Sequence, residues 1–222
     1  MKSINIFFIS NYHKSKIKKN IKINNKINFH YFNCNKKKDI YKFEKKINSI
    51  NKSKKNYLIS FSNNYIFKEK VIKKFLFKQR INFHPGLPKY PGRDVSHFAC
   101  FNRETFFGGT MHSISKKIDN GKIFDVKRFR MKKKSDHYDF TKFAHKAINF
   151  LLKKNWNKIL KKKVVSTNLK WSKSGYTRKK FLQMMKLPQK LGKEEFNKYF
   201  RSFYTYNKRS LYYLEDNKKK YI

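Results

Sequence analysis

The sequence is poor in acidic residues, cysteine, proline and glycine. Its 222 residues include 13 Asp and Glu, 2 Cys, 4 Pro and 7 Gly. Cys34 and Cys100 lie far apart and neither belongs to a CxxC pair, which argues against a disulfide framework, a zinc site or a redox motif. No apolar stretch approaches the length of a membrane span, and the first residues lack a signal-peptide cleavage pattern. We therefore expect a cytoplasmic protein with no membrane span and no metal.

Positive charge and aromatic rings, by contrast, are abundant. The 57 Lys and Arg give a net charge of +44, and 18% of the residues are aromatic. So many large rings indicate a packed core rather than a disordered chain. The charge suits a polyanionic partner such as nucleic acid or a phosphorylated ligand. Lys is spread from end to end, however, and Asn is also frequent, so we favour compositional drift as the main cause and keep a polyanionic partner as the alternative.

The first half of the chain alternates strand-like apolar runs with amphipathic segments. Runs of strand length and continuous apolar character are typical of strands buried in a parallel sheet. Such strands are expected at 4–10, 27–34, 57–61 and 80–84, with helices at 36–55 and 67–77. This order predicts an α/β fold with a Rossmann-like, mostly parallel sheet flanked by helices.

The second half adds a hairpin and several helices. The turn residues 119–121 separate strand-like segments at 110–115 and 122–130, which we expect to pair as a hairpin. Predicted helices follow at 94–102, 137–161, 178–186 and 193–203, and short Tyr-rich strands end the sequence. We therefore expect a main domain over 1–163 and a small α+β C-terminal extension over 164–222.

Three of the four prolines and two of the glycines fall in one eleven-residue stretch, NFHPGLPKYPG at 82–92. It begins where a predicted strand ends, and ligands of open parallel sheets bind at that end of the strands. Residues two apart in a strand point to the same side, so Asn82 and His84 are expected to converge. The Pro and Gly residues that follow make a stiff, tight loop beside them.

Asp119, in the IDNG turn, is the third candidate. A carboxylate beside an imidazole fixes the tautomer of the ring and raises its pKa. An amide, an imidazole and a carboxylate together can stabilise an oxyanion and move protons without a covalent nucleophile. Each signal alone is weak, because a lone His after a strand is usually a packing residue and Asp-Asn-Gly is usually a turn.

The combination resembles a known family. Residues 82–92 are similar to the N-x-H-x-x-x-P-x-x-x-G signature of the formyltransferases that use 10-formyltetrahydrofolate, and 109–112 with 118–123 resembles that family's G-x-T-x-H…L-D-x-G-x-I segment. The similarity is good over about 57–130 and looser over 1–56. The tail, including 176–180 and 201–204, resembles the shorter branch that formylates sugar nucleotides. The loop after the first strand, Asn11 to Lys14, departs from the usual Gly/Pro-rich pattern.

The resemblance implies roles for the matched residues. Asn82 would bind the formyl oxygen, His84 would stabilise the oxyanion, and Asp119 would pair with His84 and help to remove the amine proton. The folate co-substrate would contact the loop after the third strand and the segment before the Asp, at Ser62, Tyr65, Ile66, His112, Ile114 and Ile118, with His112 contributing backbone more than side chain. The acceptor would meet Pro85, Gly86, Tyr90 and Arg93.

The family's acceptors include methionyl-tRNA, glycinamide ribonucleotide and nucleotide-linked amino sugars. The tRNA enzymes carry an additional C-terminal barrel domain, which the residues after Leu160 do not suggest. The purine enzymes usually have a Gly-rich phosphate loop after the first strand, and none is visible here. Our main interpretation is therefore formylation of a nucleotide-linked amino sugar for surface polysaccharide synthesis. The alternatives are a methionyl-tRNA formyltransferase-type activity and a non-catalytic basic protein that binds nucleic acid. A homodimer is left open.

Other rings have structural explanations beside functional ones. We interpret His97 as a partly buried structural residue rather than a phosphate ligand, and His145 as a surface or packing residue. Trp171 and Tyr176 could stack on a nucleotide base or pack in a core or subunit interface, and the sequence leaves both readings open.

Overall fold

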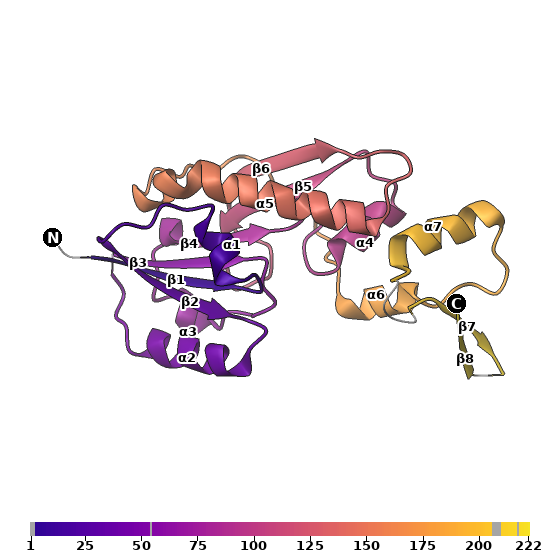
Figure 1. Ribbon diagram of the computed structural model, residues 1–222, viewed down its shortest axis with the longest axis horizontal. Helices are drawn as coiled ribbons and strands as arrows, with labels where there is room; N and C mark the ends of the chain where they lie inside the picture. Colours follow the sequence, from indigo (N-terminus) through magenta and orange to yellow (C-terminus); the bar gives the residue numbers. More distant parts are fainter. Residues whose placement is uncertain (1–2, 54, 206–209, 217) are drawn as a thin grey trace.

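A six-stranded sheet forms the centre of the molecule (Figure 1). The computed structural model describes residues 3–53, 55–205, 210–216 and 218–222. The strands lie in the order β2-β1-β3-β4-β5-β6. Their bounds are β1 Ile4–Ser10, β2 Ile27–Asn33, β3 Asn56–Phe61, β4 Arg80–His84, β5 Phe106–Ser113 and β6 Ile123–Arg130. The pairs among β2, β1, β3 and β4 are parallel, whereas β5 runs antiparallel to both β4 and β6.

Helices cover both faces of this sheet. The helices are α1 Lys14–Lys18, α2 Lys37–Asn48, α3 Glu69–Ile72, α4 Val95–Phe101, α5 His137–Leu160, α6 Arg178–Met184 and α7 Lys193–Phe203. Residues of α2 and α3 pack with Phe7 and Ile9 on one face, and residues of α1 and α5 pack with Ile6 and Phe8 on the other. The alternation of side chains along a strand therefore divides β1 between two cores, as the unbroken apolar run predicts. Together with the β5–β6 hairpin, this confirms the predicted fold class.

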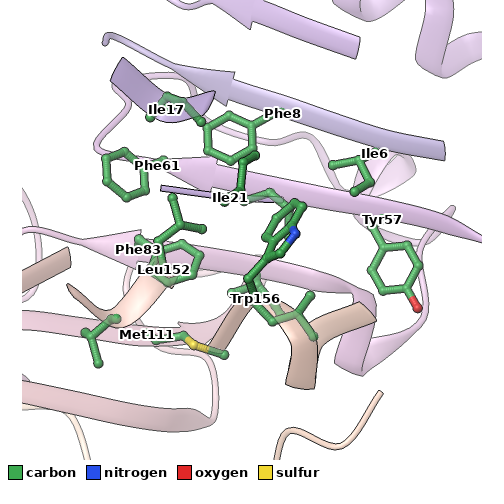
Figure 2. Packing of buried hydrophobic residues seen from close by; sticks show 14 of the residues in the cluster. Ile6, Phe8, Ile17, Ile21, Tyr57, Phe61, Phe83, Met111, Leu152 and Trp156 are labelled. Atoms are coloured by element: carbon green, nitrogen blue, oxygen red, sulfur yellow. The ribbon is translucent and has the colours of Figure 1, made fainter. Parts of the chain in front are cut away.

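The core between β1, β3 and α5 is rich in large rings (Figure 2). Phe8 is fully buried, and its ring centroid lies 5.6 Å from Phe29 and 6.1 Å from Phe61. Trp156 of α5 packs in the same cluster, and its indole N–H donates to the carbonyl of Lys22 over 2.9 Å. The aromatic excess of the sequence thus goes largely into layers that hold helices against the sheet.

We expect Phe8→Ala to lower the free energy of unfolding by about 3–5 kcal/mol, since it removes a buried ring and leaves a cavity. Chemical denaturation monitored by circular dichroism measures this change. The matched control is Tyr41→Ala, because Tyr41 on α2 is 68% exposed and its loss should change stability by less than about 0.5 kcal/mol. Equal effects of the two substitutions would contradict this description of the core.

Two predicted helices are shorter in the structure. The expected helix at 67–77 is reduced to the four residues of α3, followed by a 3-10 turn at Phe77–Gln79. The Lys74 ammonium donates to the backbone carbonyls of Asn48 and Ile50, at the end of α2. The expected helix at 36–55 likewise ends at Asn48, because the chain must turn back to start β3. Both helices are shorter than their periodicity predicts, because the chain must re-enter the sheet.

The C-terminal part lies beyond one end of the sheet, next to α4 (Figure 1). Phe181 of α6 and Phe203 of α7 pack with Phe98 of α4 and Phe140 of α5 in one hydrophobic cluster. A separate two-stranded hairpin, β7 Tyr212–Glu215 and β8 Lys218–Tyr221, follows. The boundary near residue 163 stays a prediction. In the described chain, none of the helices has the length and apolarity needed to cross a bilayer.

Candidate active site

A cavity of about 540 Å³ opens where β3 and β4 end. Its lining comes from the ends of these strands, the loop 62–67, the segment 92–96, the segment 112–119, part of α5 and residues 176–178. This is the carboxyl end of the parallel strands, where ligands of open α/β sheets bind.

Three polar side chains form a row across neighbouring strands on the floor of this cavity. Ser60 of β3 stands beside Asn82 of β4, and Asn82 stands opposite His112 of β5. The Ser60 hydroxyl donates to Asn82 Oδ1 over 2.5 Å, and Asn82 Nδ2 donates to His112 Nε2 over 3.0 Å. Strand register therefore fixes the orientation of the Asn82 amide from both sides.

Asp119 closes the row from the turn between β5 and β6. Its Oδ2 atom lies 3.3 Å from His84 Nδ1 and its Oδ1 atom lies 3.3 Å from His112 Nε2. The Gly92 backbone N–H donates to Oδ2 over 2.9 Å, and Asn82 Nδ2 donates to Oδ1 over 3.4 Å. The last of these bonds is the longest and hence the weakest. An oxygen of a bound ligand can therefore replace Asp119 Oδ1 as the acceptor of this Asn82 N–H.

The protons on His84 follow from its partners. Its Nε2 atom lies 2.8 Å from the Tyr90 carbonyl oxygen, which accepts only, so Nε2 carries a proton. Burial lowers the pKa of His84, and the Asp119 carboxylate opposes that shift only in part. Near neutral pH the ring is therefore mainly neutral, and Nδ1 faces Asp119 without a proton. One additional proton would complete the hydrogen bond between His84 Nδ1 and Asp119 Oδ2.

Asp119 is held as a carboxylate. Burial alone would raise its pKa, but the neighbouring imidazoles of His84 and His112 and the hydrogen bond from the Gly92 N–H outweigh burial and hold the pKa of Asp119 well below its usual range. With the His84 ring neutral and Asp119 ionised, His84 Nδ1 is the atom of this buried pair at which a proton can be added.

Most of the residues predicted for the site line the cavity. These are Asn82, His84 and Asp119, the proposed folate contacts Ser62, Tyr65, Ile66, His112, Ile114 and Ile118, and two proposed acceptor contacts, Pro85 and Arg93. Ile66 and Ile118 are 65% and 57% exposed, so two apolar side chains are available to a flat ring. Within the described residues, no cluster of three His, Cys, Asp or Glu side chains is arranged to hold a metal ion.

Gly86 and Tyr90, which were also predicted as acceptor contacts, do not line the cavity. Tyr90 is fully buried and its hydroxyl donates to Glu104 over 2.8 Å. The Gly86 carbonyl accepts a hydrogen bond from Thr110, behind His84. Both residues support the loop that carries the site. The spacing of proline and glycine predicts a loop at this position but does not distinguish its inner residues from its outer ones.

Part of the site was not predicted from the sequence. His112 was expected to contribute its backbone more than its side chain, whereas the imidazole itself contacts Asn82 and Asp119. The Ser60 side chain was not among the predicted site residues. Asp94, the first residue of the predicted helix at 94–102, has a positive φ of 57°, and its side chain caps no backbone N–H. Strand register, which brings Ser60 and His112 to Asn82, leaves no local trace in the sequence. The G-x-T-x-H segment was the one available signal for His112.

The remaining rings have mixed outcomes. His97 is a packing residue, as expected, with its ring 4.2 Å from that of His137 and its Nδ1 bound to the Ser202 carbonyl. His145 packs edge-on against Tyr12 and also lines the cavity. Tyr176 stacks on Tyr90 with 5.1 Å between centroids and also lines the cavity.

Known proteins resemble this chain in sequence and in fold. No protein-family model matches the chain. The chain is 31% identical over 99 residues to the methionyl-tRNA formyltransferase of Borrelia garinii subsp. bavariensis. This match covers 44% of this chain and 31% of that relative. A 4-N formyltransferase from Francisella tularensis has the same fold, with a TM-score of 0.78, 21% identity, and 99% of this chain and 96% of that chain covered. The chain is thus similar in sequence to a methionyl-tRNA formyltransferase over part of its length and similar in fold to a 4-N formyltransferase over nearly all of it.

A second formyltransferase structure shares this fold. It is an N-formyltransferase from Helicobacter canadensis in complex with folinic acid and dTDP-3-aminofucose, with a TM-score of 0.71, 19% identity, and 98% of this chain and 86% of that chain covered. The formyltransferase fold therefore extends over nearly all of this chain, whereas the sequence match to the curated relative spans less than a third of that relative's length.

Proposed function

We propose that the protein transfers a formyl group from 10-formyltetrahydrofolate to the amino group of a nucleotide-linked amino sugar. The observation that carries this proposal is the convergence of Asn82, His84 and Asp119 on the floor of one cavity. These are the three residues that match the formyltransferase motif, and their contacts form an oxyanion donor beside a proton acceptor.

One side of the cavity, formed by the loop 62–67 and the segment 112–118, supports the proposal that a folate donor binds there. The exposed side chains of Ile66 and Ile118 offer an apolar slot for the pteridine, while Ser62 has a positive φ of 44° that turns the loop sharply after β3. The N-formyltransferase of Helicobacter canadensis, which has the same fold, is in complex with folinic acid. The donor supplies the formyl carbon as an amide-like group on nitrogen.

The chain's own residues would stabilise charge and move one proton. As the amine adds to the formyl carbon, the Asn82 N–H now bound weakly to Asp119 would donate to the developing oxyanion. The His84–Asp119 pair would accept a proton from the attacking nitrogen, which completes the hydrogen bond between His84 Nδ1 and Asp119 Oδ2. When the carbon–nitrogen bond to the donor breaks, the same proton would pass to the leaving nitrogen. The amide product and the donor nitrogen then each hold their correct proton count.

The acceptor side of the cavity supports a phosphorylated ligand. Arg93 and Arg178 both line it, and both approach the single Asp94 carboxylate, at 3.9 Å and 3.5 Å respectively. Two guanidinium groups against one carboxylate leave a net positive charge at this side. Such a site suits the diphosphate of a nucleotide-linked sugar, the class of acceptor named for the Helicobacter canadensis structure.

Methionyl-tRNA is the second candidate acceptor. It is favoured by the 31% identity to a methionyl-tRNA formyltransferase and by the net charge of +44. The sugar-acceptor proposal has broader support, because its fold neighbours match nearly the whole chain.

Mass spectrometry of the acceptor tests the proposal. Purified protein is mixed with 10-formyltetrahydrofolate and, separately, with nucleotide-linked 3-amino and 4-amino sugars, glycinamide ribonucleotide and methionyl-tRNA. We expect an amino sugar to gain the mass of one carbonyl group, and we expect His84→Ala to lower the rate by at least about 100-fold. A gain on methionyl-tRNA alone would replace the proposed acceptor, and no gain on any amine would reject the proposal.

A further inference from the structure

The 167–176 segment, which connects α5 to α6, runs along the two loops that carry the site. The Thr167 N–H donates to the Ile123 carbonyl over 2.7 Å, and the Ser172 N–H donates to the Pro88 carbonyl over 3.0 Å. Tyr176 donates to the Pro91 carbonyl over 2.8 Å and accepts from the Arg93 N–H over 3.0 Å. The segment therefore joins the loop after β4 to the turn before β6.

Trp171 of this segment contacts both histidines of the site. Its ring lies edge-on to His112, with 4.8 Å between centroids and 76° between planes, and edge-on to His84, with 5.7 Å and 71°. Its indole N–H donates to the Gly121 carbonyl over 2.8 Å. Trp171 is not among the residues that line the cavity, and its ring packs against the two imidazoles.

The same segment holds Asp119 from two sides. Asp119 has a positive φ of 39°, a conformation that few residues with a side chain adopt. On one side, Trp171 binds Gly121, two residues further along the turn. On the other side, Tyr176 pairs with Gly92, whose N–H donates to Asp119. At Gly92, φ is 111° and a Cβ would clash with the Tyr176 carbonyl oxygen, so glycine is required for this approach.

We propose that Trp171 is a positioning residue of the active site, which holds the His84 and His112 rings and the Asp119 turn in register for proton transfer. The inference rests on the proposed function for its catalytic consequence, but its structural content stands on the ring contacts and on the bond to Gly121. Trp171 is contributed by the predicted C-terminal extension, which therefore completes the site rather than being an appendage to it.

Two properties should change when Trp171 is replaced. The first is the turnover number, because small displacements of acid–base groups slow a reaction more than they weaken binding. The second is the titration of His84, because burial is the largest cause of its lowered pKa, and loss of the indole admits water beside the ring.

The test compares Trp171→Phe and Trp171→Leu with a matched control, Trp156→Phe. The sequence has 2 Trp, and Trp156 also donates its indole N–H to a backbone carbonyl, but it lies in the core cluster of Figure 2. We expect kcat to fall about tenfold in Trp171→Phe and about 100-fold in Trp171→Leu, with acceptor KM nearly unchanged. Trp156→Phe should lower the melting temperature and leave kcat unchanged.

The second readout is the imidazole titration of His84, followed by NMR without any substrate. We expect the His84 pKa to move up towards its ordinary value, by about one pH unit, in Trp171→Leu, to move less in Trp171→Phe, and to stay in place in Trp156→Phe. Wild-type kcat and an unchanged His84 titration in both Trp171 variants would overturn the inference. If wild-type protein formylates nothing but the titration shifts in the Trp171 variants alone, the positioning role stands and the proposed function fails.

Discussion

Asp119→Asn is expected to lower kcat/KM by about 1,000-fold while the protein remains folded. Asn has nearly the same shape, and its oxygen can still accept from the Gly92 N–H that now binds Asp119 at 2.9 Å. It carries no negative charge, however, and cannot share a proton with His84. Steady-state kinetics measures the loss, and circular dichroism with thermal unfolding checks the fold. Turnover within a few-fold of wild type would contradict the role of the His84–Asp119 pair.

The pH profile gives the same substitution a second readout. In wild type, kcat/KM should fall as the pH drops through the His84 pKa, because a His84–Asp119 pair that is already protonated cannot accept the amine proton. Burial lowers that pKa, so the acid limb should lie below about 6.5. The Asp119 carboxylate raises the pKa of His84, so the limb of the residual activity in Asp119→Asn should move to still lower pH. A limb that moved upward would contradict the assigned pair.

Asn82→Ala is expected to lower kcat by about 100-fold to 1,000-fold with little change in acceptor KM. The Asn82 amide is fixed by Ser60 and His112, and one of its N–H groups forms the weak 3.4 Å bond to Asp119. Removing this donor takes away a bond that strengthens as charge develops on the formyl oxygen.

Asn155→Ala is the matched control for that experiment. Asn155 is buried, and its amide donates to Asp125 and to the Leu151 carbonyl, outside the cavity lining. We expect this control to lower stability and to leave kcat unchanged. If Asn82→Ala raised KM and left kcat intact, Asn82 would be a binding residue and not an oxyanion donor.

The sequence predicts the parts of this molecule that depend on local pattern. The apolar run at β1, the two-residue spacing of Asn82 and His84, and the turn residues around Asp119 each have a local physical signature. Together they gave the strand order along the chain, the end of the sheet where the cavity opens, and the three motif residues. The order of the strands across the sheet, with β1 between β2 and β3, depends on the right-handed crossovers typical of parallel strands.

What the sequence could not predict depends on register and on long-range contacts. The His112 imidazole joins the site because β5 pairs with β4 so that His112 stands opposite Asn82. Trp171 reaches the histidines through an irregular segment that has no periodicity. Tyr90 was assigned to the acceptor but is buried, because its hydroxyl is satisfied by Glu104 and Asn102 from neighbouring elements. Such contacts are made only when the chain has folded.

A single-turnover reaction with donor labelled by ¹³C at the formyl carbon tests the central claim most directly. Excess protein is mixed with the labelled donor and a nucleotide-linked amino sugar, and NMR follows the labelled carbon. We predict that the label appears as a formamide on the sugar nitrogen with wild-type protein and stays on the donor with His84→Ala. Release of the label as formate, or a label that stays on the donor with every amine, would contradict the assignment of this site to formyl transfer.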